Sequence, residues 1–319
     1  MSISKIIAVV GATGDQGSGV VDAVLKNTSY AVRALTTDST SDKAKVVAEK
    51  NKDAAAAGRF TIVQANLGDV DSLKAALAGV SVVYGMTAPS PVEIRQGKNL
   101  VDAAKAAGVE HLIWSSLPSI AKLSGGKYSR VFFAESKAVV EQYARDHLQH
   151  VTALLPGSFW RNLAFPWYTT RKPDGTVRFA LMPKHADPAV GWTDSKVDFG
   201  VFVAAILNKP LSLTSGKTYP VMTVGGNSSA ELAARYAAKT GEAAAWEPLE
   251  VDEFKAMMSK VPFGEVMEGA ALDLFNFIDS TPANTTCFGM FSRDEDPSLE
   301  LDVKASTLEE WLDRSGWKA

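Results

Sequence analysis

The chain has 319 residues and a formal net charge of −3, from 33 basic and 36 acidic residues. This balance argues against nucleic acid or an anionic membrane as a partner, so we expect small molecules. The single cysteine, Cys287, excludes an internal disulfide and is typical of a reducing compartment, which we expect to be the cytoplasm. The first apolar run, in MSISKIIAVVG, is too short for a signal peptide or a membrane span.

Six short apolar runs alternate with helical patterns as far as about residue 155. They are KIIAVV, YAVRALT, RFTIVQA, VSVVYGM, EHLIWSS and VTALLP. Buried parallel strands read as continuous apolar runs because helices cover both faces of their sheet. Between them, DVDSLKAALAG and QGKNLVDAAKAAG have helical patterns that stop at glycine. The alternation predicts an α/β fold with a doubly wound parallel Rossmann sheet, and residues 1–155 as a dinucleotide-binding domain.

The residue pattern and composition of the sequence change after Pro156. The stretch PGSFWRNLAFPWYTTRKPDG is irregular and rich in aromatic residues and proline, and helical patterns resume at SSAELAARYAAKTG. We therefore expect residues 156–319 to form mainly a smaller portion that faces a substrate or a partner. Some of its segments are expected to return to the Rossmann core.

A glycine-rich loop, VVGATGDQG, directly follows the first strand and opens a helix. Gly11 permits the tight turn, Gly14 lets the backbone approach a pyrophosphate, and Gly17 lets helix and strand pack closely. The helix N-terminus then offers free N–H groups to the phosphates. We expect Gly11, Thr13, Gly14 and Gly17 to bind a dinucleotide; a purely structural glycine turn is the alternative.

Several further motifs occur in a characteristic order. They are VQANLGD, RQGKNLVDAAKAAGVEHLIWSS, FFAESKAVVEQYARD, LLPGSFWRNL, TDSKVDFG and TLEEWLD. Together with the glycine loop, they make nearly the whole chain resemble the NmrA-like group of atypical short-chain dehydrogenases. Members of this group range from cofactor-sensing regulators to isoflavone-reductase-like and quinone reductases. The resemblance implies a nicotinamide dinucleotide as ligand and leaves catalysis and sensing both open.

The end of the second strand bears on the choice of cofactor. An NAD-binding Rossmann domain usually has a carboxylate there that binds the ribose 2′-OH, whereas this chain has Thr36. Thr37 stands where NADP-sensing members of the family carry arginine, and Asp38 would repel a phosphate. The resemblance favours NADP(H), with NAD(H) as the alternative, and it implies further contacts from Asn66 and Thr87. A solvated loop that caps the next helix is the alternative.

The catalytic machinery of ordinary short-chain dehydrogenases is incomplete here. Their Tyr-x-x-x-Lys pair corresponds to Phe133 and Lys137, so the tyrosine that donates a proton is missing. The resemblance implies a ribose-binding role for Lys137 and places Ser116 at the position of the family's serine, beside the reacting group. A surface lysine is the alternative for Lys137. Tyr128 is expected to be a packing residue, with a substitute proton donor as the alternative.

The stretch PGSFWRN leaves the sixth strand where the family lines its nicotinamide pocket. The resemblance implies Phe159 and Asn162 as contacts near the nicotinamide, and Trp160 and Arg161 as residues that face a substrate. Phe133 is expected in the same pocket. A core between the two portions is the alternative for these aromatic residues. We find no metal-site, P-loop or serine-hydrolase motif, so no metal is expected.

Two functions from different classes fit the sequence. The first is a reductase that transfers a hydride to a quinone, an enone or an iminium, since such acceptors need little acid catalysis. The second is a redox sensor in which NADP(H) changes the affinity for a regulatory protein. The small-molecule pocket favours the first, and Phe133 in place of tyrosine favours the second. A monomer and a homodimer both fit.

Overall fold

A parallel sheet of seven strands lies at the centre of the computed structural model, which describes residues 5–180 and 188–319. In sheet order the strands are β11 (Thr218–Val221), β6 (Val151–Pro156), β5 (His111–Ser115), β4 (Val82–Gly85), β1 (Ile6–Val10), β2 (Ala31–Thr36) and β3 (Phe60–Gln64). Every pairing in this sheet is parallel. The order reverses between β1 and β4, as it does in a doubly wound Rossmann fold. The predicted fold class is confirmed.

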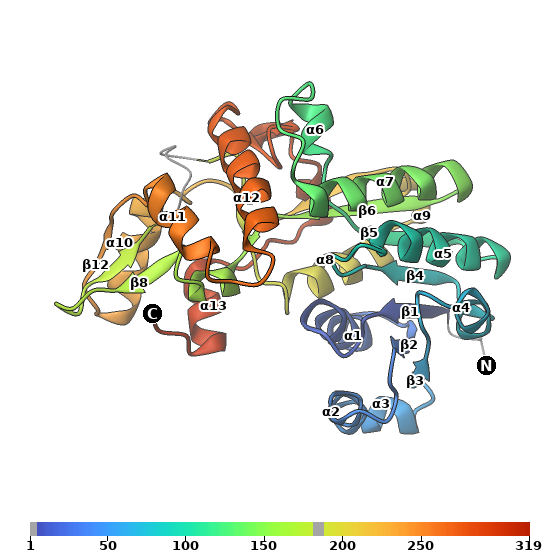
Figure 1. Ribbon diagram of the computed structural model, residues 1–319. Helices are drawn as coiled ribbons and strands as arrows, with labels where there is room; N and C mark the ends of the chain where they lie inside the picture. The colour runs from blue at the N-terminus through green and yellow to red at the C-terminus, as the bar shows by residue number, and fades with distance from the viewer. Residues whose placement is uncertain (1–4, 181–187) are drawn as a thin grey trace.

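Helices cover both faces of the sheet (Figure 1). One face packs against α1 (Asp15–Asn27) and α8 (Asp198–Leu207). The other face packs against α4 (Val70–Leu77), α5 (Glu93–Ala106) and α7 (Phe132–His147). Shorter helices complete the connections: α2 (Asp42–Lys50), α3 (Lys52–Ala56), α6 (Ile120–Leu123) and α9 (Leu211–Thr214). Because both faces are covered, β5 and β6 are buried at every residue, which explains their continuous apolar sequences.

Several segments from beyond residue 155 belong to this Rossmann unit: β11, α8, α9 and η3 (Pro297–Leu301), which packs against β11 and α8. Strand β11 pairs in parallel with β6 at the edge of the sheet, and α8 packs along α1. The sequence of α8, DFGVFVAAIL, is apolar nearly throughout because most of its residues are buried. The carboxyl ends of β1 and β4–β6 therefore meet at one edge of the sheet, where a parallel α/β fold holds its ligand.

The remaining segments form the second portion, which lies beside the carboxyl end of the sheet in Figure 1. Its strands are β7 (Ser158–Phe159), β8 (Thr169–Arg171), β9 (Val177–Phe179), β10 (Trp192–Thr193), β12 (Ala244–Trp246), β13 (Thr285–Thr286) and β14 (Phe291–Ser292). Its helices are η1 (Trp160–Ala164), α10 (Ser229–Thr240), α11 (Val251–Met258), α12 (Gly264–Asp279), η2 (Arg293–Glu295) and α13 (Leu308–Ser315). Among the described helices, none combines the length and the apolar character needed to cross a bilayer.

Helices α1 and α8 approach each other through glycine. A Cβ on Gly19 would lie 2.0 Å from the carbonyl oxygen of Lys196, and a Cβ on Gly200 would lie 2.2 Å from the carbonyl oxygen of Gly19. These distances are too short for a real Cβ, so neither helix tolerates a side chain at the crossing. This close approach packs α8 directly against α1, the helix that follows the glycine loop.

We predict that Gly19→Ala destabilises the protein. In a helix without tertiary contacts this change stabilises by up to about 1 kcal/mol, whereas overpacking at the crossing should lower the free energy of unfolding by about 1–3 kcal/mol. Urea unfolding measures the difference, with the neighbouring Ser18→Ala as the control. A more stable Gly19→Ala protein would contradict the described crossing.

Candidate functional site

The loop between β1 and α1 takes its shape from two of its glycines. Gly11 has a φ of +66°, which favours glycine, and a Cβ on Gly17 would lie 2.2 Å from the carbonyl oxygen of Gly11. The first bond of the α1 ladder runs from the N–H of Ser18 to the carbonyl of Gly14, at 2.9 Å. The N–H groups of Asp15, Gln16 and Gly17 precede that bond, so they have no acceptor within the helix.

Gly14 differs from the other two glycines because the protein does not need it for its own packing. It is exposed, it has an extended backbone, and a Cβ there would meet only the carbonyl oxygen of Gly11, at 3.4 Å. The helix end next to it has no side-chain cap. Thr13, in the same loop, is half-buried. Free N–H groups, the positive end of the helix dipole and an uncovered glycine fit a pyrophosphate group.

We predict that Gly14→Val leaves the protein folded and weakens dinucleotide binding by more than about tenfold, because the new side chain would occupy the phosphate site. Calorimetric titration with NADPH measures the affinity, and urea unfolding checks the fold. Gly17→Ala is the contrasting variant, since its Cβ would collide with the loop itself and should lower stability. Unchanged NADPH affinity in Gly14→Val would refute the phosphate site.

A buried carboxylate organises the centre of the site. Glu93, the first residue of α5, is 1% exposed. Its Oε1 accepts a hydrogen bond from Thr87 Oγ1 at 2.7 Å, and its Oε2 accepts one from Ser136 Oγ at 2.5 Å. Lys137 Nζ forms an ion pair with Glu93 and donates to the carbonyl oxygen of Thr87 at 2.9 Å. Glu93 therefore fixes the end of the Lys137 side chain.

Lys137 is not the surface lysine of the alternative interpretation. Its side chain is 12% exposed and lines a cavity between the two portions. Two of the three donor positions on Nζ are occupied by Glu93 and Thr87, so one remains for a ligand. The sequence analysis missed Glu93, because SPVEIRQG reads as an ordinary acidic start of an exposed helix.

We predict strong coupling between Glu93 and Lys137. Removing one partner of a buried ion pair typically costs about 3–5 kcal/mol, because the other charge is left unpaired. Glu93→Gln and Lys137→Met should each be destabilising, and the double variant should lose much less than the sum of the two. Urea unfolding gives the free energies of unfolding of the four proteins in this double-mutant cycle. The exposed pair Glu49 and Lys52 is the control, and simple additivity at Glu93 and Lys137 would contradict the pairing.

The cavity has a volume of about 520 Å³. Six of the residues proposed from the sequence line it: Thr87, Ser116, Phe133, Lys137, Phe159 and Asn162. The opposite wall comes from the second portion and is mostly apolar, with Phe165 and Trp167 from the segment after η1 and Leu274 and Phe275 from α12. The cavity therefore has polar groups beside the sheet and aromatic and aliphatic groups across from it, as ligand sites commonly do.

The wall formed by α12 is attached to the start of α7. The guanidinium and backbone N–H of Arg130 donate to both carboxylate oxygens of Asp273, at 2.6 to 3.1 Å. These bonds hold the pKa of Asp273 below its usual value. Asp273 is nearly buried, so this contact fixes α12 across the cavity from Lys137.

The ends of β4 and β5 are joined to the glycine loop by Gln16. Its Oε1 accepts hydrogen bonds from Tyr84 Oη and Ser115 Oγ, both at 3.2 Å. Ser116 follows directly, is fully buried, and donates to the carbonyl oxygen of Leu117 at 3.4 Å. Both Gln16 and Ser116 line the cavity. Gln16 was not predicted from the sequence, because the glycine spacing specifies no residue type between the second and third glycines of the loop.

Two expectations in PGSFWRN need correction. Trp160 is fully buried, stacks on Trp192 with ring centroids 4.8 Å apart, and donates to the carbonyl oxygen of Ser306 at 2.9 Å. It belongs to the core, which was the alternative interpretation. Arg161 is exposed and pairs with Asp15 at the start of α1, and it is not part of the cavity wall. The short helix η1 turns these two side chains away from the cavity.

The residues proposed near the adenosine end lie at the carboxyl ends of β2 and β3. Thr36 is buried, and its hydroxyl donates to the carbonyl oxygen of Asp38 at 3.3 Å. Thr37 and Asn66 are exposed at the ends of β2 and β3. Hydrogen bonds from Thr40 lower the pKa of Asp38, so its carboxylate stays ionised at neutral pH. A negative charge therefore lies next to the position expected for a 2′-phosphate.

Tyr128 packs edge-on against Phe277, with ring centroids 6.2 Å apart, and is not among the residues that line the cavity. It is a packing residue, as the sequence analysis expected. Within residues 5–180 and 188–319, no group of three or more His, Cys, Asp or Glu side chains is placed to hold a metal ion.

Comparisons with known proteins place these features in a wider context. The sequence profile of the NmrA-like family matches residues 3–312. The NmrA-like family domain-containing oxidoreductase malD of Malbranchea aurantiaca is 30% identical over 240 residues, which is 70% of this chain and 68% of malD. A crystal structure of NmrA, a negative transcriptional regulator, in complex with NAD superimposes with a TM-score of 0.77 at 21% identity, covering 99% of this chain and 98% of that one. The NADPH-dependent quinone oxidoreductase QOR2 of Escherichia coli, complexed with NADPH, gives 0.72 at 21% identity, covering 98% and 99%.

Proposed function

The chain belongs to the NmrA-like family, and we propose that it is a reductase that uses NADPH to reduce an activated acceptor: a quinone, an enone or an iminium. Residues 1–155 would supply most of the dinucleotide site, and residues 156–319 most of the acceptor site. The related protein malD is named an oxidoreductase, and QOR2 is named a quinone oxidoreductase, which supports this reaction class.

The observation that carries the proposal is the cavity beside Lys137 and Ser116. Its volume of about 520 Å³ lies within the range of small-molecule sites, which is roughly 300–1,000 Å³. The part across from the sheet is lined by Phe165, Trp167 and Leu274, which suits a flat apolar acceptor. Thr87, Lys137 and Phe159 line the same cavity, so the nicotinamide would occupy one part of it and leave the apolar part to the acceptor.

The glycine loop supports a dinucleotide cofactor, and NAD and NADPH are bound by the structural relatives NmrA and QOR2. When bound, NADPH supplies the hydride. Gly11, Thr13, Gly14 and Gly17 would hold its pyrophosphate, and Thr36, Thr37 and Asn66 its adenosine end. Because Asp38 is ionised and no arginine stands at position 37, we expect only a narrow preference for NADPH over NADH.

Two polar residues at the cavity, Lys137 and Ser116, have a role in this proposal. Lys137, fixed by Glu93, would donate its remaining N–H to a ribose hydroxyl, and Ser116 would donate to the oxygen of the acceptor. Phe133 cannot donate a proton, and general acid catalysis typically contributes about 10²–10⁴-fold. Acceptors that are already activated lose least from its absence, so unactivated ketones should react poorly.

We predict that the protein oxidises NADPH with quinone, enone or iminium acceptors and not with plain ketones, as measured by nicotinamide absorbance. Ser116→Ala should lower kcat roughly two- to tenfold, because one neutral hydrogen bond is lost, with the NADPH affinity unchanged by calorimetry. The exposed Ser259→Ala is the matched control. No turnover across a broad acceptor panel would refute the reductase.

The second candidate is a cofactor-responsive regulator, favoured by Phe133 at the tyrosine position and by the similarity to the regulator NmrA. Its action would require the two redox forms of the cofactor to stabilise different conformations. Different protease sensitivity of residues 156–319 with NADPH and with NADP⁺, in the absence of any turnover, would establish this alternative.

A further inference from the structure

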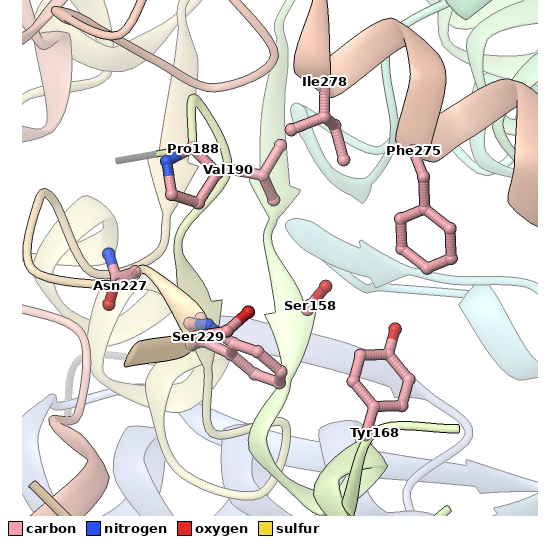
Figure 2. A pocket seen from close by; sticks show the side chains of 9 residues that line it. Ser158, Tyr168, Pro188, Val190, Asn227, Ser229, Phe275 and Ile278 are labelled. Atoms are coloured by element: carbon pink, nitrogen blue, oxygen red, sulfur yellow. The ribbon is translucent and has the colours of Figure 1, made fainter. Parts of the chain in front are cut away.

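A small, mostly apolar pocket adjoins the cavity. It has a volume of about 30 Å³, enough for a water molecule, and it shares Ser158, Tyr168, Val190, Phe275 and Ile278 with the large cavity. Figure 2 shows the hydroxyl of Tyr168 directed toward the space between Ser158 and Phe275. Asn227 and Ser229 line the same pocket on its other side.

Tyr168 and Ser158 carry the polar groups where this pocket meets the large cavity, since both line the two spaces. Each hydroxyl can donate one hydrogen bond and accept others. Asn227 is 3% exposed and its Nδ2 has no hydrogen-bond partner among the described residues. It lies at the far side of the pocket, away from Tyr168 and Ser158 (Figure 2), so the two hydroxyls are the groups that a molecule in the large cavity can meet.

Tyr168 is held rigidly in this position. Its N–H donates to the carbonyl of Phe165 at 2.9 Å, and its carbonyl accepts from the N–H of Ala180 at 2.8 Å. Its ring packs edge-on against Trp192, with centroids 5.9 Å apart. Burial raises the pKa of Tyr168 to about 12, opposed by a hydrogen bond with Ser158. The phenol therefore keeps its proton at neutral pH and can donate a hydrogen bond.

We propose that Tyr168 and Ser158 form an anchor for a neutral carbonyl oxygen of the substrate, in addition to the group that reacts beside Ser116. The inference rests on the proposed function, since it takes the cavity as the site of the acceptor. It makes the preferred substrate an apolar molecule with a second oxygen, such as a quinone or an enone that carries a further carbonyl.

The surroundings of this pair favour a neutral oxygen. The described residues that line the pocket carry no charge, and most of them are apolar. A carbonyl oxygen has two lone pairs, so it can accept from the hydroxyls of Tyr168 and Ser158 at once, as a tightly bound water also can.

The test compares binding of menadione, which has two carbonyl groups, with binding of methylnaphthalene, which has none, to the NADP⁺-loaded protein by calorimetry. NADP⁺ prevents reduction, so the measurement does not depend on turnover. In Tyr168→Phe we expect menadione affinity to fall by roughly two- to tenfold, because one neutral hydrogen bond is lost. Methylnaphthalene affinity should stay the same. Tyr128→Phe is the control, since it makes the same chemical change outside the cavity.

Ser158→Ala is the second variant, and it should weaken menadione binding alone in the same way. Equal losses for menadione and methylnaphthalene would mean that Tyr168 only packs, and would overturn the anchor. Unchanged menadione affinity in both variants would also overturn the anchor, and it is the result expected if only a water occupies the pocket. Failure of the wild type to bind menadione would overturn it as well. NADPH oxidation assayed in parallel separates the two proposals: turnover with unchanged binding in both variants refutes the anchor alone, and selective weakening without turnover refutes the reductase alone.

Discussion

The arrangement of the site depends on one buried charge. The carboxylate of Glu93 is almost fully enclosed, so it must be paired and hydrogen-bonded, and its partners come from two other parts of the chain. Thr87 follows β4, and Ser136 and Lys137 lie on α7. The hydrogen bonds and the ion pair of the Glu93 carboxylate therefore fix α7 against the end of β4. They also fix the lysine amine at the edge of the cavity, in a position that a flexible surface lysine would not hold.

The same helix links this charge to the substrate side. Arg130, just before α7, binds Asp273 on α12, so the apolar wall across the cavity is positioned relative to Lys137. Only the carboxylate of Asp273 is buried here, whereas its partner is largely exposed, so breaking this pair should cost less free energy of unfolding than breaking the Glu93 pair. In the proposed reductase, the far wall would therefore adjust to acceptors of different shape more easily than the side that holds Lys137.

The Rossmann unit was largely predictable because its signals are local. Each of the first six strands is a continuous apolar run, and the glycine loop follows the first of them. The family prediction rests on several motifs in order, and it is confirmed by the match over residues 3–312. The seventh strand, TYPV, was not identified, since four residues with a proline carry no strand signal by themselves. It forms because β6 offers an unpaired edge, which is a property of the folded sheet.

The site was less predictable because its decisive contacts join residues far apart in the chain. Lys137 and Ser116 were found through motif positions, and the structure brings both to one cavity. Glu93 and Tyr168 have no motif, and their importance comes only from burial beside partners supplied by other elements. Trp160 shows the opposite case: its neighbours in sequence line the cavity, yet η1 rotates it into the core. Sequence position therefore located the reacting end of the site, whereas the chemistry at the other end depends on which side chains folding leaves facing the cavity.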